Sequence, residues 1–173
     1  ITAVTQPAHG TVTNTNTIAT YTPATGYLGL DSFTYTISDG QNHTATATVN
    51  ISVNQAPAIT SANAVTFIVG TAGTFAVTTT GFPVPAITRG GVALPNGVTF
   101  VNNGNGTGTL SGTAAAGTNG TYALTFTASN GVSPNSSQNF TLTVNSAGPV
   151  NRPPTITTTA PTTATVGQLY SYD

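Results

Sequence analysis

The sequence contains no cysteine, lysine, glutamate, methionine or tryptophan. Without cysteine it can form no disulfide, and without lysine it can form no Lys–Asn isopeptide cross-link. Formal charge is confined to Arg89, Arg152, Asp31, Asp39 and Asp173. Such sparse charge creates no basic field for nucleic acid, and no apolar run approaches the roughly 18 residues of a membrane span. We therefore expect no nucleic-acid partner and no membrane insertion in this segment.

The residues that are abundant favour an all-β fold. There are 39 threonines among 173 residues, with 19 glycines and 11 prolines. β-Branched residues with frequent turn formers and few strong helix formers predict short strands. Since 38% of the residues are hydrophobic and the net charge is only -1, we expect a folded chain rather than a disordered one.

An internal repeat with an offset of 97 residues links the middle of the chain to its last residues. The matching pairs are Pro57 and Pro154, Ile59 and Ile156, Val69 and Val166, Gly70 and Gly167, and Phe75 and Tyr172. This offset is close to the length of one immunoglobulin-like sandwich with its linker, about 100 residues. The chain is therefore interpreted as a sample of a tandem array.

The repeat predicts three domains, of which the first and last are incomplete. Residues 1–53 hold the later strands of one sandwich, 57–145 form a complete one, and 154–173 begin another. Linkers are expected at 54–56 and 146–153. Two explanations of the ends stay open: the sequence is a window cut from a longer polypeptide, or residues 154–173 complete the first domain of a neighbouring copy by strand donation.

Two long hairpins are predicted, at FTYTISDG (33–40) and LTFTASNG (124–131). Asp39-Gly40 and Asn130-Gly131 favour tight type I′ turns. The closing strands are expected at 44–53 and 137–144, and the first should turn its apolar residues to the core. That core-facing set is Ala45, Ala47, Val49, Ile51 and Val53. Tyr122, at the start of a long strand, is expected to form a tyrosine corner.

Longer stretches resemble a known family. VTQPAHGTVT (4–13) and YTPATGYLGLDSFTYTISDG (21–40) resemble bacterial cadherin-like and Ig-like tandem repeat domains of large cell-surface proteins. LPNGVTF (94–100), GTLSGTAAAGTNGTYALTFTASNG (108–131) and NFTLTV (139–144) are similar to Ig domains of the same proteins. The resemblance implies a spacer or adhesive role outside the cell, in adhesins, stalks, surface layers or enzyme appendages.

Cadherin-like repeats commonly hold calcium in acidic clusters at domain junctions, but these linkers contain no acidic residue. Tight calcium binding needs six to eight oxygen ligands, including several carboxylates. Asp173, the start of a truncated acidic motif, is therefore only a weak calcium candidate, and otherwise no cofactor is expected. Asp31 and Asp39 are interpreted as turn and hairpin residues.

No catalytic set emerges from the remaining reactive residues, and we predict that the segment is not an enzyme. Asp31 and Asp39 lie eight residues apart on one predicted strand, at about 3.3 Å per residue, too far apart for a glycosidase pair. His9 lies in a turn sequence, where a structural role is favoured. His43 is expected beside the Asp39 hairpin, within reach of Asp39 or Asp31, and neither histidine lies in a nucleophile or metal motif.

Six Asn-x-Ser/Thr triplets are possible glycosylation sites. They begin at Asn42, Asn50, Asn105, Asn119, Asn135 and Asn139. Tyrosines 21, 27, 35 and 122 offer aromatic faces for sugar stacking, although Tyr35 and Tyr122 are predicted to face the core.

These observations predict a non-enzymatic, extracellular or cell-surface segment of prokaryotic type, acting as a stalk, fibre or surface-layer element. Its expected partners are adjacent repeats, further copies of itself and surface polysaccharide. Head-to-tail joining is one expected form of self-assembly. The absence of lysine leaves edge strands less guarded against such contacts. The alternative is a carbohydrate-binding accessory module of a secreted protein.

Overall fold

The computed structural model describes residues 1–148, 153–155 and 166–167, and its regular elements are all β-strands. The first five are β1 (Ala3–Val4), β2 (Gly10–Asn14), β3 (Ala19–Pro23), β4 (Gly29–Ser38) and β5 (Thr44–Val53). The next four are β6 (Gln55–Ile59), β7 (Ala64–Ile68), β8 (Ala72–Phe82) and β9 (Ala86–Gly91). The last four are β10 (Val98–Asn102), β11 (Thr107–Thr113), β12 (Gly120–Ser129) and β13 (Ser136–Asn145). The all-β prediction is confirmed.

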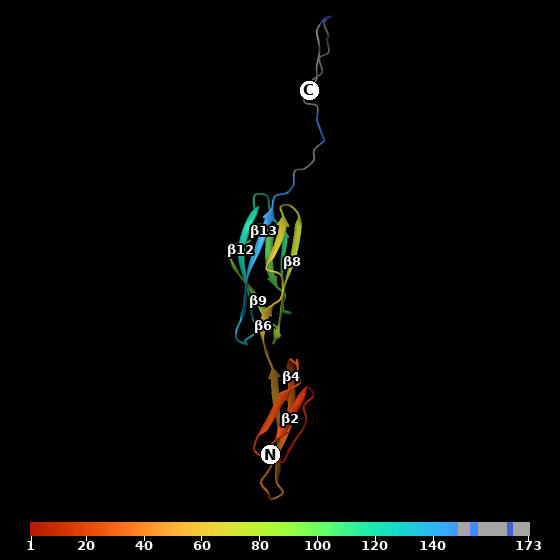
Figure 1. The fold of residues 1–173 in the computed structure, drawn as a ribbon, viewed down its shortest axis with the longest axis vertical. Helices are drawn as coiled ribbons and strands as arrows, with labels where there is room; N and C mark the ends of the chain where they lie inside the picture. The colour runs from red at the N-terminus through yellow and green to blue at the C-terminus, as the bar shows by residue number, and fades with distance from the viewer. Residues whose placement is uncertain (149–152, 156–165, 168–173) are drawn as a thin grey trace.

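The strands form two units that follow one another along the long axis (Figure 1). In the first unit, residues 1–53, a three-stranded sheet of order β1-β4-β5 packs with the two-stranded sheet β2-β3. Val12 of β2 and Phe33 of β4 are buried between these layers, at 5% and 6% exposure. The chain passes once from the first unit to the second, from β5 into β6.

The second unit, residues 55–145, is a sandwich of two four-stranded sheets. Their orders are β10-β11-β8-β6 and β7-β13-β12-β9. The pairs are antiparallel except that β7 runs parallel to β13. Consecutive strands β6 and β7 thus belong to different sheets and join the two layers along one side of the sandwich.

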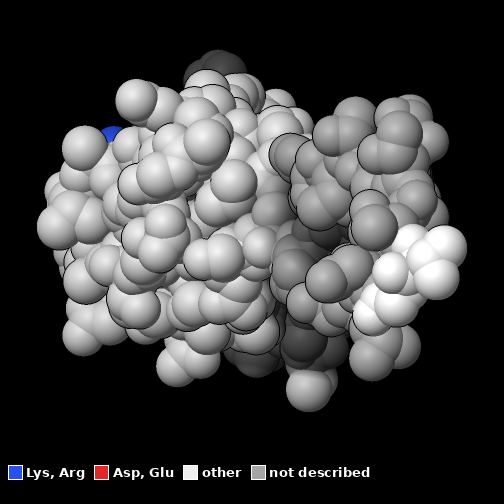
Figure 2. Space-filling view, turned by 90° about the horizontal axis from the view of Figure 1, so that it is seen from above, with Lys and Arg blue, Asp and Glu red and all other residues white. Residues whose placement is uncertain are grey.

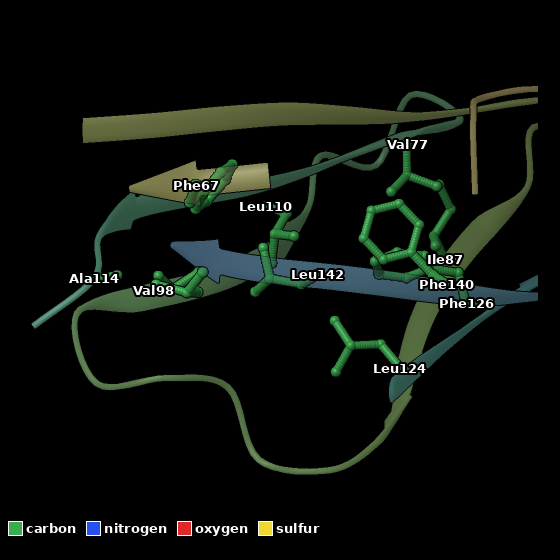
Figure 3. Close-up of a cluster of buried hydrophobic side chains, with 11 residues drawn as sticks. Phe67, Val77, Ile87, Val98, Leu110, Ala114, Leu124, Phe126, Phe140 and Leu142 are labelled. Carbon is green, nitrogen blue, oxygen red and sulfur yellow. The ribbon is translucent and has the colours of Figure 1, made fainter. Parts of the chain in front are cut away.

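Alternating sequence places the core of the second unit between its sheets (Figure 3). On β12, Leu124, Phe126 and Ala128 are buried, and the threonines between them lie on the other face. Phe126 meets Phe140 of β13 edge to face, with ring centroids 5.0 Å apart. Phe100 and Phe75, from the opposite sheet, each lie 5.0 Å from one of these rings. Aromatic contacts therefore tie the two layers together.

Two local predictions were wrong at the hairpins. A type I′ turn needs positive φ at both central residues, whereas among non-glycine described residues only Asn16 and Asn42 have positive φ. The β4–β5 connection instead spans residues 39–43, and β12–β13 spans 130–135. The physical reason is that Asp39 and Asn130 turn their side chains onto backbone amides of the loop, which stabilises a wider connection.

The boundary between the units and the end of β5 also differ from expectation. Strand β6 begins at Gln55, so Asn54 alone separates the strands where a linker of 54–56 was predicted. On β5 the alternation holds for Val49, Ile51 and Val53, but Ala45 and Ala47 are exposed. The far end of the β4–β5 hairpin has no second layer over it among the described residues. Residues 154–173 lie mostly outside the described part, so that domain assignment stays a prediction.

Replacing Phe126 by alanine should lower the free energy of unfolding of the second unit by about 3–5 kcal/mol, because it leaves a cavity between the sheets. Urea unfolding measures this loss. Val101→Ala is the matched control: Val101 is 55% exposed, and its replacement should change stability by no more than about 0.5 kcal/mol. Equal losses in the two variants would contradict the assignment of the core.

Candidate functional site

The most connected polar group in the first unit is the carboxylate of Asp31, which is only 9% exposed. Its oxygens accept hydrogen bonds from the amides of Ala8, His9 and Ser32, at 3.2, 3.0 and 2.9 Å. The Tyr21 hydroxyl, on β3, donates a fourth bond at 3.0 Å. Asp31 therefore holds the loop before β2 and the strand β3 against β4.

The loop that delivers these amides is fixed by its own side chains. Gln6 donates to the Val12 carbonyl and accepts from the Val12 amide, each at 2.9 Å, in the way a strand neighbour would. The ring of His9 stacks on Tyr27, with centroids 4.2 Å apart and planes 9° apart. These contacts preorganise the loop so that the amides of Ala8 and His9 point at the carboxylate of Asp31.

The four donors also set the charge state of this cluster. Burial on its own would raise the pKa of Asp31, but the hydrogen bonds from the Ser32 amide, from Tyr21 and from the loop outweigh it and hold the pKa below the ordinary value of 3.8. The pKa of Tyr21 rises above 10.0, through burial first and then through its bond to Asp31. A carboxylate so fully engaged is a poor base, and its arrangement suits structural anchoring.

The interpretation of Asp31 as a turn residue, made from the sequence, was wrong. It lies inside β4, and its side chain shares a face with Phe33. The signal was present in GLDSFTY, because the two-residue period puts Asp31 on the apolar face. A charged residue at such a position needs partners, and the sequence alone did not show that they would come from residues 8, 9 and 21.

Asp39 and His43 form a separate, exposed pair at the tip of the β4–β5 hairpin. His43 Nδ1 lies 2.7 Å from Asp39 Oδ2, as expected for His43 beside Asp39. The same carboxylate accepts from the Gln41 amide at 2.7 Å. That bond and then the His43 contact hold the pKa of Asp39 below 3.8. Asp31 lies near the start of β4 and Asp39 just beyond its end, so the two carboxylates are not brought together.

Two polar contacts stabilise the second unit at its ends. The Tyr122 hydroxyl donates to the carbonyl of Thr118, four residues upstream, at 2.8 Å, which confirms the predicted tyrosine corner. At the end next to the first unit, Asn130 Nδ2 donates to the carbonyls of Gln55 and Pro83, each at 2.8 Å. Asn130 thus clamps the start of β6, immediately after the junction residue Asn54.

The surface offers few other groups for binding chemistry. In the end-on view of Figure 2 the described surface is neutral apart from one small basic area. No group of three or more metal-ligating residues occurs among the described residues, and the calcium candidate Asp173 lies outside them. The six predicted glycosylation asparagines are all exposed. No helix in the described part has the length and hydropathy to cross a membrane.

The Asp31→Asn substitution should lower the melting temperature of the first unit at pH 7, because the carboxylate loses its charge-assisted bonds. Since the folded pKa of Asp31 is lowered, its contribution is present above about pH 4 and is lost as the pH falls through the folded pKa. The variant should therefore lose less stability on acidification than the wild type. Thermal melts from neutral to acid pH test this.

Asp39→Asn is the control for that experiment, because it removes an exposed carboxylate from the hairpin tip and leaves the anchor intact. We expect a smaller fall in melting temperature at pH 7. If Asp31→Asn and the wild type showed parallel acid unfolding, the anchoring role of Asp31 would be wrong.

Comparisons with known proteins agree with this architecture. A family model described as "Bacterial Ig domain" matches residues 1–52, and one described as "Putative Ig domain" matches residues 47–145. No curated protein matches the chain. The similarity to cadherin-like repeats in particular stays a prediction.

Among solved structures, a chimeric titin Z1Z2 carrying a decorin peptide is 25% identical, with 54% of this chain and 98% of that chain covered and a TM-score of 0.44. The Ig1-2 module of the Drosophila receptor protein tyrosine phosphatase DLAR is 23% identical, with coverages of 54% and 50% and a TM-score of 0.43. An endo-fucoidan hydrolase of glycoside hydrolase family 107 is 18% identical, with coverages of 84% and 24% and a TM-score of 0.42.

The match to residues 47–145 extends over more than half of the 173 residues and includes both sheets of the second unit. Ig-like domain families of this kind are generally non-enzymatic and support a structural or adhesive repeat role. The chain therefore belongs to the Ig-like family whose model carries the description "Putative Ig domain", preceded by a region similar to a bacterial Ig domain.

Proposed function

We propose that the segment is a spacer in an extracellular or cell-surface protein of a prokaryote, where Ig-like units in series form a stalk, fibre or surface-layer element. The observation that carries the proposal is the junction: β5 of the first unit leads into β6 of the second through Asn54 alone, with the units in series along one axis (Figure 1). Each unit contributes its own core, and each junction adds a nearest-neighbour contribution.

The hydrogen bonding of the two aspartate carboxylates favours a spacer role over a catalytic one. The carboxylate of Asp31 is engaged by four donors within the first unit, and that of Asp39 is bound within its own hairpin. The two carboxylates do not pair with each other. Hydrolytic activity of the purified segment would overturn the proposed spacer role. If that activity persisted in the Asp31→Asn and Asp39→Asn variants, it would come from a different site.

The stalk proposal predicts an extended particle in solution, and small-angle X-ray scattering tests it. We expect a pair-distance distribution with the long tail of two units in series, whereas a single compact peak would contradict the proposal. Adjacent repeats and further copies of the chain are the proposed partners. Head-to-tail joining of copies would appear as filaments by electron microscopy.

Asn130→Ala should loosen the junction, because it removes both bonds that fix the start of β6 to the loops of the second unit. Scattering should then show a broader distribution of maximum dimensions, with the core of the second unit still folded. Asn135→Ala, in the same exposed loop, is the matched control and should leave the profile unchanged. A similar broadening in both variants would show that Asn130 does not set the junction.

A carbohydrate-binding accessory module is the second candidate. The observation that favours it is the His9–Tyr27 stack, beside a surface hollow of about 310 Å³ whose lining includes Ala8, His9 and Thr22. Aromatic faces are suited to stacking on sugar rings. Retention on polysaccharide gels that is lost in Tyr27→Ala would favour this function, and absence of retention would leave the spacer.

The six exposed Asn-x-Ser/Thr sites, of which Asn50 and Asn139 lie on strands and the others in loops, are proposed as positions where glycans would cover the neutral surface. Intact mass spectrometry of this segment, expressed in the native host, tests this. Attachment should raise the mass above the 17.2 kDa of the unmodified segment, whereas recovery of the unmodified mass alone would exclude glycosylation.

A further inference from the structure

The loops of the second unit contain all five Asn-Gly dipeptides of the chain. Asparagine followed by glycine is especially prone to spontaneous deamidation, because glycine has no side chain to shield its backbone nitrogen and readily adopts the conformations that ring closure needs. The pairs are Asn96-Gly97, Asn103-Gly104, Asn105-Gly106, Asn119-Gly120 and Asn130-Gly131. The folded structure holds these five pairs very differently.

Deamidation in a folded protein requires local freedom. The asparagine side chain must rotate onto the nitrogen of the next residue, the peptide between the two residues must turn, and water must reach the site. Every hydrogen bond that holds the side chain or this peptide has to break first, and each such bond slows the reaction by about fivefold. Hydrogen bonding therefore ranks the five pairs.

Three of the asparagines are held by their own side chains. Asn130 Nδ2 donates to two backbone carbonyls, each at 2.8 Å. Asn103 Nδ2 donates to two threonine hydroxyls, at 2.9 and 3.0 Å. Asn105 Oδ1 accepts from the amide and the hydroxyl of Thr107, at 3.1 and 2.7 Å. Each of these side chains has to break two bonds before it can react.

The fourth pair, Asn96-Gly97, is held through its backbone. The Asn96 carbonyl accepts from the Ala115 amide at 2.9 Å, and the Gly97 carbonyl accepts from the Thr113 amide at 3.0 Å. The first of these carbonyls belongs to the same peptide as the nitrogen that would attack. A Cβ on Gly97 would lie 2.0 Å from the Thr113 carbonyl oxygen, so this peptide is also tightly packed.

Asn119 differs from the other four. Its side chain is exposed, and in the part of the chain that the structure describes neither its carboxamide nor its backbone groups have a hydrogen-bond partner. A Cβ on Gly120 would meet no atom within 4 Å, so the peptide is open to water. Gly120 is the first residue of β12 and faces Val144 at the terminal rung of the β12–β13 ladder. Such a rung opens by fraying of one residue pair.

We propose that Asn119 is a self-modifying site that deamidates in the folded protein before the other four asparagines. The Gly120 nitrogen attacks Cγ of Asn119, and its proton passes through water to the departing Nδ2. The bond from Cγ to Nδ2 breaks, ammonia leaves and a succinimide ring forms. Water then opens the ring at one of its two carbonyls and gives aspartate or isoaspartate. Water is the only co-reactant, and the reaction is independent of the spacer role.

Both products alter the connection before β12. Each adds a negative charge to a loop that has no charged residue. Isoaspartate also carries the main chain through Cβ, which adds one atom to the backbone between Thr118 and Tyr122. Thr118 is fixed to the Ala115 carbonyl through its amide and hydroxyl, at 3.2 and 2.7 Å, and its own carbonyl accepts from Tyr122 at 2.8 Å. The added atom therefore weakens the tyrosine corner.

The same asparagine begins one of the six Asn-x-Ser/Thr triplets, Asn119-Gly120-Thr121. Deamidation removes the nitrogen to which a glycan would be attached. A glycan on that nitrogen would in turn prevent ammonia from leaving. The two modifications of Asn119 therefore exclude each other.

A time course of the whole purified segment at mildly alkaline pH tests the proposal. Peptide mapping uses a protease that cleaves after aromatic residues, because the chain has two arginines and no lysine. Each conversion raises the mass by about 1 Da, and fragment spectra assign it to one asparagine. We expect Asn119 to convert about tenfold faster than each of the other four. Conversion of any other pair as fast as Asn119 overturns the proposal.

The same time course in urea is the control for the role of the fold. The bonds that protect the other four pairs are then absent, so the five rates should converge. If Asn119 kept its full advantage in urea, local sequence rather than the fold would set the order, and the proposal would fail. In the folded Asn119→Gln variant the fast phase should disappear, because the longer side chain closes a six-membered ring more slowly.

Thermal melts test the effect on the tyrosine corner. Asn119→Asp reproduces the new charge without lengthening the backbone, so it should melt close to the wild type. Aged wild type, enriched in isoaspartate at position 119, should melt at a lower temperature than Asn119→Asp. Equal melting temperatures for these two samples would overturn the effect on the corner.

Discussion

Backbone hydrogen bonding between neighbouring strands is the interaction on which both units depend. The described residues contain one arginine and two aspartates, so ion pairs contribute little, and there is no cysteine to cross-link the layers. The side-chain contacts that supplement the strand ladders are formed by uncharged groups. Threonine hydroxyls pair across strands, as between Thr36 and Thr46 at 2.9 Å and Thr60 and Thr78 at 2.8 Å, and such cross-strand pairs each contribute a modest part of sheet stability.

This reliance on neutral contacts makes the one buried carboxylate more important. The first unit has only a two-stranded layer over its three-stranded sheet, and Val12 and Phe33 are its buried hydrophobic residues. Asp31 compensates by joining three segments through one side chain, since its four donors come from the loop before β2, from β3 and from β4 itself. A hydrophobic residue there would fill space but would leave the amides of Ala8 and His9 to find other partners.

The sequence predicted the features that depend on local pattern. Strand period, the tyrosine corner at Tyr122 and the strands of the second unit follow from alternation and from tyrosine placed at a strand start, and the structure has them. It failed where partners come from distant residues. Asn130 was interpreted as a turn residue, yet its amide binds Gln55 and Pro83, 75 and 47 residues away. The burial of Asp31 and the exposure of Ala45 and Ala47 were also missed, because burial depends on which distant layer lies opposite each residue.

The two closing strands show the difference between what local pattern predicts and what distant partners decide. TATATVNISV in β5 and SSQNFTLTVN in β13 both alternate, and both follow a long antiparallel partner. Their burial differs: Phe140, Leu142 and Val144 are buried, whereas Ala45 and Ala47 are exposed. Strand period assigns the faces, but a second layer decides whether a face becomes core. In the second unit β7 and the opposite sheet supply that cover. A repeat of this family thus encodes its strands locally and acquires its stability from whatever packs beside them, which is the physical basis for function through repetition.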